Sequence, residues 1–313
     1  MPADTDAAQR MCGFGRSVAE RRVSRGHLHR SGGHIMTRRV ENQVALITGA
    51  GRGQGRSHAI RLAEEGADII AVDACKPIDG VPYDMSTAED LKETARAVEA
   101  LGRRIIIAEA DVRDLDTLSS VVTEAVGELG RLDIVSGNAG IAGPFAAADE
   151  LDPQAWQTTV DINLTGVYNA ARAAIPHIKA GGRGGSIVLT SSMAGLKPYL
   201  NAANYVAAKH GVTGLMKALA LELAPFSIRV NSIHPTQVDT PMIQNPAMYG
   251  LFCPDIENPT KADFEAASRT TNAMPVPWVE AIDISNALLF LASEEARFIT
   301  GAALPVDAGC NLL

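Results

Sequence analysis

Three residues near the middle of the chain have the types and spacing needed to take a proton from an alcohol. Ser192 follows the apolar run Ser186–Thr190, and Tyr205 and Lys209 come later on a predicted helix. Tyr205 and Lys209 are four residues apart, so they share one helix face. A free tyrosine has a pKa of about 10, and an ammonium group one turn away favours the phenolate. We expect Tyr205 to accept the proton of a hydroxyl that Ser192 orients, with Lys209 lowering the Tyr205 pKa.

A glycine-rich turn follows the first apolar run, Val44–Thr48, and leads into a predicted helix; residues 48–55 read TGAGRGQG. Glycines allow a sharp turn and let backbone N–H groups approach a pyrophosphate, which then faces the positive end of the helix dipole. Such a turn can be purely structural, but its place between strand and helix is the one dinucleotide binding requires. The expected dinucleotide contacts in this turn are Gly49, Arg52, Gly53, Gln54 and Gly55.

Asp73 lies at the end of the second predicted strand and favours NAD over NADP. A carboxylate there accepts hydrogen bonds from the adenosine ribose and repels a 2′-phosphate. Capping of the strand end is the structural alternative. Arg52 argues the other way, because a cation in the loop can pair with a 2′-phosphate. A carboxylate facing a phosphate is strongly unfavourable in a partly dry site, whereas Arg52 can turn to solvent or pair with Asp73, so we predict NAD.

These residues lie in a regular alternation of apolar strands and helices that starts near Asn42. The predicted strands are Val44–Thr48, Asp68–Val72, Arg104–Ala108, Leu132–Ser136, Ser186–Thr190, Ile228–Ile233 and Ala303–Val306. The predicted helices are Arg56–Glu65, Ala88–Leu101, Leu115–Leu129, Pro153–Lys179, Ala202–Ala224 and Glu280–Ser293. Strands that are apolar on both faces and alternate with helices indicate parallel β-structure between two helical layers. We predict a single-domain α/β fold of the Rossmann type, with a doubly wound, seven-stranded parallel sheet.

The overall composition excludes several classes of protein. With 313 residues, 46% of them apolar, the chain is an ordinary globular protein. A net charge of −8 argues against nucleic-acid binding, and no apolar run approaches the roughly 18 residues of a membrane span. Four scattered cysteines show neither metal-site nor disulfide-framework spacing, so we expect no metal, free thiols and a cytoplasmic location. They are Cys12, Cys75, Cys253 and Cys310.

Residues 1–35 differ from the rest of the chain. They hold six Arg against three acidic residues, a net charge of +3, and lack the apolar segment of a secretory signal. An organelle transit peptide would also be Arg-rich, but no amphipathic period is evident. We expect a disordered extension, consistent with an over-long start for which Met36 is the natural alternative, followed by one domain over residues 36–313.

From about Asn42 to Gly309 the sequence resembles the short-chain dehydrogenase/reductase family. Residues 48–55 match its T-G-x-x-x-G-x-G turn, and Ser192, Tyr205 and Lys209 match its catalytic residues. The resemblance implies that Asn163 completes a catalytic tetrad by keeping a water that bridges to the lysine. It also implies cofactor contacts after the third and fourth strands. These are Asp111 and Val112, which would hold adenine, and Asn138, Ala139 and Gly140.

The segment after the sixth strand departs from the common family pattern. It reads HPTQVDTPM over residues 234–242, with Pro-Thr in place of Pro-Gly. The resemblance implies that Pro235, Val238 and Thr240 hold the nicotinamide. Pro-Thr is typical of a subgroup, the mycofactocin-coupled, carveol dehydrogenase-like enzymes. In that subgroup NAD is thought to stay bound and to be reoxidised by mycofactocin, a peptide-derived redox cofactor.

Two irregular segments bear on access to the predicted site. The insertion Ala74–Met85 lies beside the adenosine end, where it either covers the cofactor or forms an inert surface loop. The stretch of about 240–277 either closes over substrate as a lid or fills a subunit interface. Its apolar residues, together with Phe145, Met193, Leu196 and Tyr199, predict an apolar pocket. We expect an uncharged alicyclic or terpenoid secondary alcohol, or its ketone, as substrate.

Two other functions compete with a secondary-alcohol dehydrogenase. An NADPH-dependent ketoreductase acting on carrier-protein substrates is favoured by Arg52 but opposed by Asp73. A non-catalytic dinucleotide sensor would not need the Tyr205–Lys209 pair. The resemblance implies a homotetramer, and we expect apolar positions on the second long helix to lie in its interface; they are Val212, Leu215, Leu219 and Leu223. We expect His58, His177 and His210 to be solvated or helix-capping, and His234 to be structural.

Overall fold

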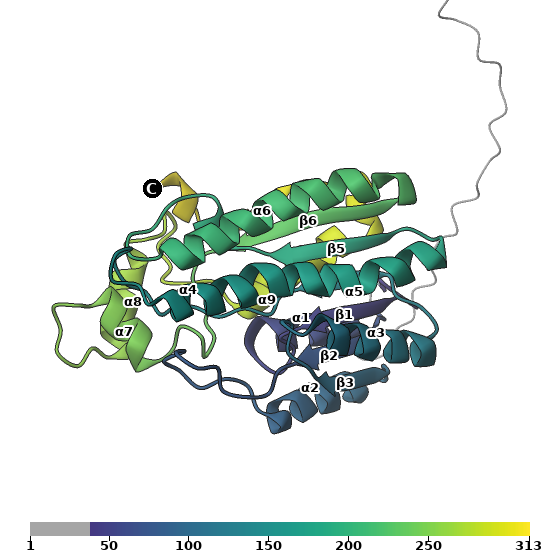
Figure 1. Cartoon of the computed structure of the whole chain (residues 1–313), viewed down its shortest axis with the longest axis horizontal. Helices are drawn as coiled ribbons and strands as arrows, with labels where there is room; N and C mark the ends of the chain where they lie inside the picture. Colours follow the sequence, from purple (N-terminus) through teal and green to yellow (C-terminus); the bar gives the residue numbers. More distant parts are fainter. Residues whose placement is uncertain (1–37) are drawn as a thin grey trace, which may run out of the picture. The chain divides into compact units, whose positions relative to one another are not determined.

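The computed structural model describes residues 38–313, so the predictions for residues 1–35, Met36 and Cys12 lie outside the described part. Seven parallel strands form one sheet in the order β3-β2-β1-β4-β5-β6-β7 (Figure 1). The strands are β1 Val44–Thr48, β2 Asp68–Asp73, β3 Ile105–Glu109, β4 Ile134–Gly137, β5 Gly185–Thr190, β6 Ile228–Pro235 and β7 Ala303–Val306. The predicted doubly wound α/β fold is confirmed, and the predicted strand bounds differ by no more than two residues.

Helices cover both faces of the sheet, and each face has its own apolar core. Helices α1 (Gly53–Glu64), α2 (Ala88–Ala100) and α9 (Ala281–Ala292) pack on one face. Helices α3 (Leu115–Leu129), α5 (Gly166–Gly181) and α6 (Ala203–Leu223) pack on the other. The central strands β1 and β2 are buried along their whole length, as the apolar runs require. The edge strands β3 and β7 are only partly buried.

The predicted helix Pro153–Lys179 is not uniform. It consists of α4 (Pro153–Val160), a π-helical turn at Asp161–Thr165, and α5. A π-turn inserts an extra residue into the helix and is frequent at functional sites. Here it carries Asn163, whose side chain is fully buried.

The segment of about 240–277 is more regular than expected. It contains two short helices, α7 (Pro246–Phe252) and α8 (Lys261–Arg269). Asn245 caps α7 by accepting a hydrogen bond from the backbone N–H of Met248, and Thr260 caps α8 in the same way with Asp263. Such capping residues are local sequence signals for the start of a helix, and the prediction of an irregular segment, made from its apolar residues, overlooked them.

Two expectations about helix surfaces are wrong. Val212, Leu219 and Leu223 are buried in the core of the chain itself, so they are not available to a partner subunit; Leu215 is partly buried against the same core. His58 is neither solvated nor a cap. Its Nδ1 lies 2.8 Å from the hydroxyl of Ser285 at the buried contact of α1 with α9.

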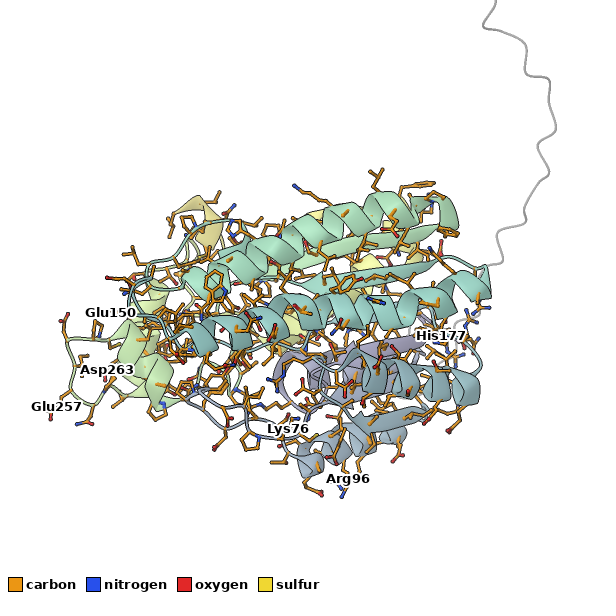
Figure 2. All side chains as sticks on the ribbon, in the orientation of Figure 1. Lys76, Arg96, Glu150, His177, Glu257 and Asp263 are labelled. Atoms are coloured by element: carbon orange, nitrogen blue, oxygen red, sulfur yellow. The ribbon has the colours of Figure 1, made fainter. Side chains whose placement is uncertain are left out.

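Charged side chains lie on the surface of the described part. Arg96 and Glu257 point away from the body of the fold (Figure 2). Within residues 38–313 there is no cluster of three or more potential metal-ligating side chains. Nor does any helix in this range have the length and apolar character to cross a membrane.

Candidate functional site

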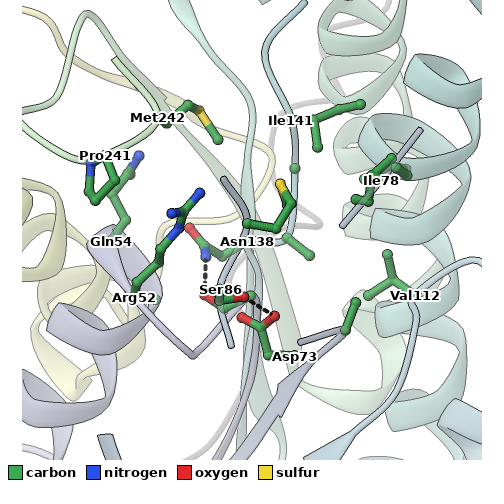
Figure 3. A pocket seen from close by; sticks show the side chains of 18 of the residues that line it. Arg52, Gln54, Asp73, Ile78, Ser86, Val112, Asn138, Ile141, Pro241 and Met242 are labelled. Carbon is green, nitrogen blue, oxygen red and sulfur yellow. Dashed lines mark hydrogen bonds between the residues drawn. The ribbon is translucent and has the colours of Figure 1, made fainter. Parts of the chain in front are cut away.

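A pocket opens at the carboxyl ends of β1 and β4, where the strand order reverses (Figure 3). Ligands of doubly wound sheets bind at this kind of switch point. Thr48, the last residue of β1, ties the two strands together there. Its hydroxyl accepts hydrogen bonds from the backbone N–H groups of Asn138 and Ala139, both at 3.1 Å. The Asn138 amide in turn donates to the Thr48 carbonyl at 3.0 Å.

The glycine-rich turn forms one wall of this pocket, and its geometry requires glycine. Gly49 has φ +68°, in the left-handed region. A Cβ on Gly55 would lie 1.9 Å from the Gly49 carbonyl oxygen, so no side chain fits. Helix α1 starts at Gly53, so its first N–H groups lack helical partners. Gln54 lines the pocket, and its buried Oε1 has no partner (Figure 3). This cradle fits a dinucleotide pyrophosphate.

Asp73 is held at the end of β2 by three donors. One carboxylate oxygen accepts from the Gly51 N–H at 2.8 Å, and the other accepts from the Cys75 N–H at 3.1 Å and from the Ser86 hydroxyl. Arg52 was expected either to turn to solvent or to pair with Asp73, and it does neither. Its guanidinium donates to the Asp84 carbonyl.

The insertion Ala74–Met85 forms a second wall of the pocket, and we call it the strap. Ile78, Tyr83 and Met85 line the pocket opposite the glycine-rich turn. The strap is attached on both sides. Arg52 binds it from the turn, and the Tyr83 hydroxyl accepts a hydrogen bond from the Ala142 N–H at 2.8 Å.

Asp111 and Val112 lie at the adenosine end of the pocket. The Asp111 carboxylate is paired with Arg113 at 2.7 Å and with Lys76 at 3.3 Å. Burial acts to raise the pKa of Asp111, but the hydrogen bonds from Arg113 outweigh it and lower the pKa to about 2. The carboxylate therefore stays ionised, and its side chain braces the strap through Lys76.

Ser192, Tyr205 and Lys209 are brought together at the other end of the site. The Ser192 hydroxyl is a neighbour of Tyr205 that acts to lower the Tyr205 pKa. The Lys209 ammonium lies 5.7 Å from the centre of the Tyr205 ring and donates to the Thr190 carbonyl at 3.0 Å. Lys209 is 3% exposed. A hydroxyl pair with a buried amine beside it is an arrangement for proton transfer.

The pKa values of this group differ from expectation. Burial raises the pKa of Tyr205, and the Ser192 hydroxyl lowers it by less. Burial also lowers the pKa of Lys209 to about 8. The pKa of Tyr205 is therefore shifted opposite to the expected direction, because burial disfavours the phenolate more than the Ser192 hydroxyl favours it.

Asn163 lies beside this group, and its side chain is held by the backbone of Ile141. Its Oδ1 accepts from the Ile141 N–H and its Nδ2 donates to the Ile141 carbonyl, both at 2.8 Å. The bond to Ile141 fixes the amide in place beside the lysine. Gly140 separates the two side chains, since a Cβ there would lie 3.1 Å from the Asn163 Oδ1 and 3.6 Å from the Lys209 Nζ.

The end of β6 supplies the residues expected at the nicotinamide. Pro235 and Val238 are buried, and the Thr240 hydroxyl donates to the Val238 carbonyl at 3.2 Å. Thr240 also faces the glycine-rich turn, with its side chain 3.3 Å from a Cβ built on Gly53. The loop after β6 thus reaches across to the start of α1.

Helices α7 and α8 enclose a small apolar cluster next to Tyr205. Phe264 is fully buried among the rings of Tyr249, Phe252 and Trp278. Phe145 packs against the same cluster, and its ring meets that of Tyr205 edge to face at 6.0 Å. The Tyr205 ring therefore lies beside an apolar cluster, at the place where the sequence predicts an apolar pocket.

Most of the residues predicted to bind the cofactor line one pocket. They are Gly49, Arg52, Gly53, Gln54, Gly55, Asp73, Asp111, Val112, Asn138, Ala139, Gly140 and Thr240. Tyr205, Lys209, Pro235 and Val238 are not among its lining residues. Sequence reasoning missed the individual roles of Tyr83, Ser86 and Met242, which also line it. Only their nearness to Asp73 or Thr240 in the chain could have suggested them.

Residues 43–247 match the short chain dehydrogenase family, so the chain belongs to it. It is 64% identical over 275 residues to a (−)-trans-carveol dehydrogenase of Rhodococcus erythropolis, covering 88% of this chain and 99% of that one.

Two solved structures are similar. A carveol dehydrogenase from Mycobacterium avium in complex with NAD is 55% identical with a TM-score of 0.87, over 88% of this chain and 99% of that one. A short chain dehydrogenase from Mycobacterium paratuberculosis bound to NAD is 45% identical with a TM-score of 0.81, over 88% and 100%.

Proposed function

We propose that this chain interconverts a small apolar secondary alcohol of the carveol type and its ketone. It is an NAD-dependent alcohol dehydrogenase. The observation that carries the proposal is the buried Lys209 ammonium 5.7 Å from the Tyr205 ring, set in one fold with the glycine-rich pocket. Asp73 at the edge of that pocket favours NAD over NADP.

Each residue of the group has its own role in the proposed reaction. Bound NAD⁺ supplies the hydride acceptor and a positive charge near the phenol. Ser192 orients the substrate hydroxyl, and the Tyr205 oxygen takes its proton. Lys209 holds an ammonium group beside the tyrosine, which favours the phenolate against the effect of burial. Asn163 completes the group by keeping a water that bridges to Lys209. The apolar wall around Phe145 excludes water.

Replacing Tyr205 tests this function. In Tyr205→Phe the proton acceptor is lost while the ring and its packing on Phe145 remain. We expect turnover with carveol to fall by at least about 100-fold, the usual scale of acid–base catalysis, while the Kd for NAD stays the same. NADH formation followed by absorbance measures the first, and a binding titration the second. A variant with near-normal turnover would contradict the proposed chemistry.

The apolar wall supports an uncharged ring alcohol as substrate. Phe145, whose ring packs on Tyr205, and the cluster behind it are built of uncharged side chains that suit an apolar ring. We infer that the segment of about 240–277 acts as a lid. It is fastened to the loop after β6, because Gln244 donates to Asp239 at 2.6 Å and accepts from the Tyr249 hydroxyl at 2.9 Å.

We further propose that the strap slows NAD release and that mycofactocin reoxidises the bound cofactor. The two attachments of the strap, at Asp84 and Tyr83, support slow release. Turnover with NAD alone should then be poor, and an artificial electron-accepting dye should restore it. Ordinary multi-turnover rates with free NAD, from protein purified without nucleotide, would rule out retention but leave the dehydrogenase function standing.

We propose a cytoplasmic homotetramer. Cys75, Cys253 and Cys310 are free thiols, which suits a reducing compartment. Large apolar side chains are exposed on the single chain at Leu221, Phe298, Leu312 and Leu313. Exposed apolar surface of this kind commonly marks a symmetric interface.

A further inference from the structure

A buried histidine lies next to the catalytic group, contacts Ser192, and takes no part in the proposed proton transfer. His234, near the end of β6, is 0% exposed. Its Nδ1 lies 2.9 Å from the Ser192 carbonyl oxygen, and its Nε2 lies 2.8 Å from the Ser232 hydroxyl. Both ring nitrogens are therefore engaged.

The partners fix the form of the imidazole ring. A carbonyl oxygen can only accept, so Nδ1 must carry the hydrogen that binds Ser192. The Ser232 hydroxyl can donate to the unprotonated Nε2, which satisfies both groups with a neutral ring. Burial lowers the pKa of His234, which agrees with this neutral form.

The Ser192 carbonyl lies just beyond the regular pairing of β5 with β6. The last backbone bond of that pairing is from the Ser191 N–H to the Ile233 carbonyl, at 2.9 Å. Beyond it, the Ser192 carbonyl is held by the Gly195 N–H at 2.9 Å and by His234. The Gly195 bond lies within a short local turn, so only His234 ties this peptide to β6.

Rotation of this peptide would move the hydroxyl that orients the substrate. The Ser192 hydroxyl accepts from the Ala194 N–H at 3.1 Å within the same turn. Its position is therefore set by the turn as a whole. His234 precedes Pro235, so one side chain joins the substrate-orienting serine to the strand whose end carries the proposed nicotinamide contacts.

We propose that His234 is a positioning residue, and that its Nδ1–H holds the Ser192 peptide so that the Ser192 hydroxyl keeps its place relative to the end of β6. It touches neither substrate nor reacting atoms. The inference rests on the role proposed above for Ser192. Misplacement of a reacting group by about 1 Å can cost roughly 100-fold in rate.

Two substitutions separate the two hydrogen bonds of the ring. The amide nitrogen of Asn is as many bonds from Cβ as Nδ1, so His234→Asn can keep the bond to Ser192. The amide nitrogen of Gln matches Nε2, so His234→Gln keeps only the contact with Ser232. Ser232→Ala is the matched control, because it removes the other bond and leaves Nδ1 in place.

We expect His234→Gln to lower kcat by about 10- to 100-fold. We expect kcat of His234→Asn and of Ser232→Ala to stay close to wild type, because both variants keep the bond that places the Ser192 peptide. Across these variants, the Kd for NAD and the melting temperature should not change in parallel with kcat. Equal kcat in the Asn and Gln variants, or losses of kcat that track NAD affinity or melting temperature, would overturn the proposal.

Ser192→Ala distinguishes failure of the inference from failure of the proposed function. In a Ser192→Ala background, His234→Gln should cause no further loss of kcat. If Ser192→Ala is itself fully active, the proposed function of Ser192 is wrong. If Ser192→Ala is impaired but His234→Gln is not, only the present inference is wrong.

A measurement on the unsubstituted protein covers the case in which the variants do not fold. Nitrogen NMR of labelled histidine reports which ring nitrogen carries the hydrogen. After sequence-specific assignment of the ring signals, we expect His234 to be neutral with its hydrogen on Nδ1. A ring protonated on Nε2 alone would overturn the proposal.

Discussion

The strap over the cofactor pocket is attached at a point where a single oxygen atom can be removed. The Tyr83 hydroxyl accepts the Ala142 N–H at 2.8 Å, and Tyr83→Phe deletes that oxygen while keeping the ring. If the strap retains NAD, the closed state loses one hydrogen bond that the open state never had. The substitution should therefore speed release of NAD more than it weakens the fold.

The size of the effect follows from the net value of one hydrogen bond. A bond of this kind contributes about 0.5–1.5 kcal/mol. Since about 1.4 kcal/mol corresponds to a factor of ten, the dissociation rate of NAD should rise roughly 2- to 13-fold. The second attachment, from Arg52 to the Asp84 carbonyl, remains, so the strap should not open completely.

Stopped-flow displacement of bound NADH, followed by its fluorescence, gives the dissociation rate directly. Tyr168→Phe is the matched control, because it removes the same atom from a tyrosine that is 38% exposed and is not among the residues lining the pocket. A Tyr83→Phe rate equal to wild type, or equal to the control, would refute the view that this contact holds the strap closed.

Three further results are expected. Asp73→Asn keeps an acceptor for the Gly51 N–H but removes the charge, so titrations should show the preference for NAD over NADP falling at least about tenfold. Burial lowers the pKa of His58 to about 3, so the unfolded chain binds more protons below about pH 6.5. The free energy of unfolding should therefore decrease as the pH is lowered below about 6.5, by up to about 1.4 kcal/mol per pH unit. Urea titrations at two pH values should show less pH dependence in His58→Gln but not in His210→Gln. Light scattering should give four times the mass of one chain.

The sequence was sufficient for the parts of the site that depend on chain order. Parallel strands end at one edge of the sheet, so residues following β1, β2, β4 and β5 had to meet there. That argument placed Asp73 and Asn138 around the glycine-rich turn, where the structure has them.

Contacts between side chains distant in the sequence could not be predicted in the same way. Nothing near His58 indicates that Ser285 will lie against it. Nothing near Val212 shows that the core of the chain itself covers that face of α6. The pKa of Tyr205 also escaped prediction, because the cost of burying a phenolate depends on packing by Phe145 and its neighbours.

The hydrogen bonds of Thr48 to the end of β4 have a consequence for how the protein is made. They join residues 90 positions apart, because β4 pairs with β1 in the sheet although β2 and β3 come between them in the chain. Contacts of such long range are formed late and slowly in folding. During synthesis, the chain up to β3 holds the glycine-rich turn and the strap but not the residues after β4 that line the same pocket. Thr240 closes the same pocket from still further along. A growing chain should therefore bind NAD only after the loop following β6 has left the ribosome, and truncations ending before that loop should not retain it.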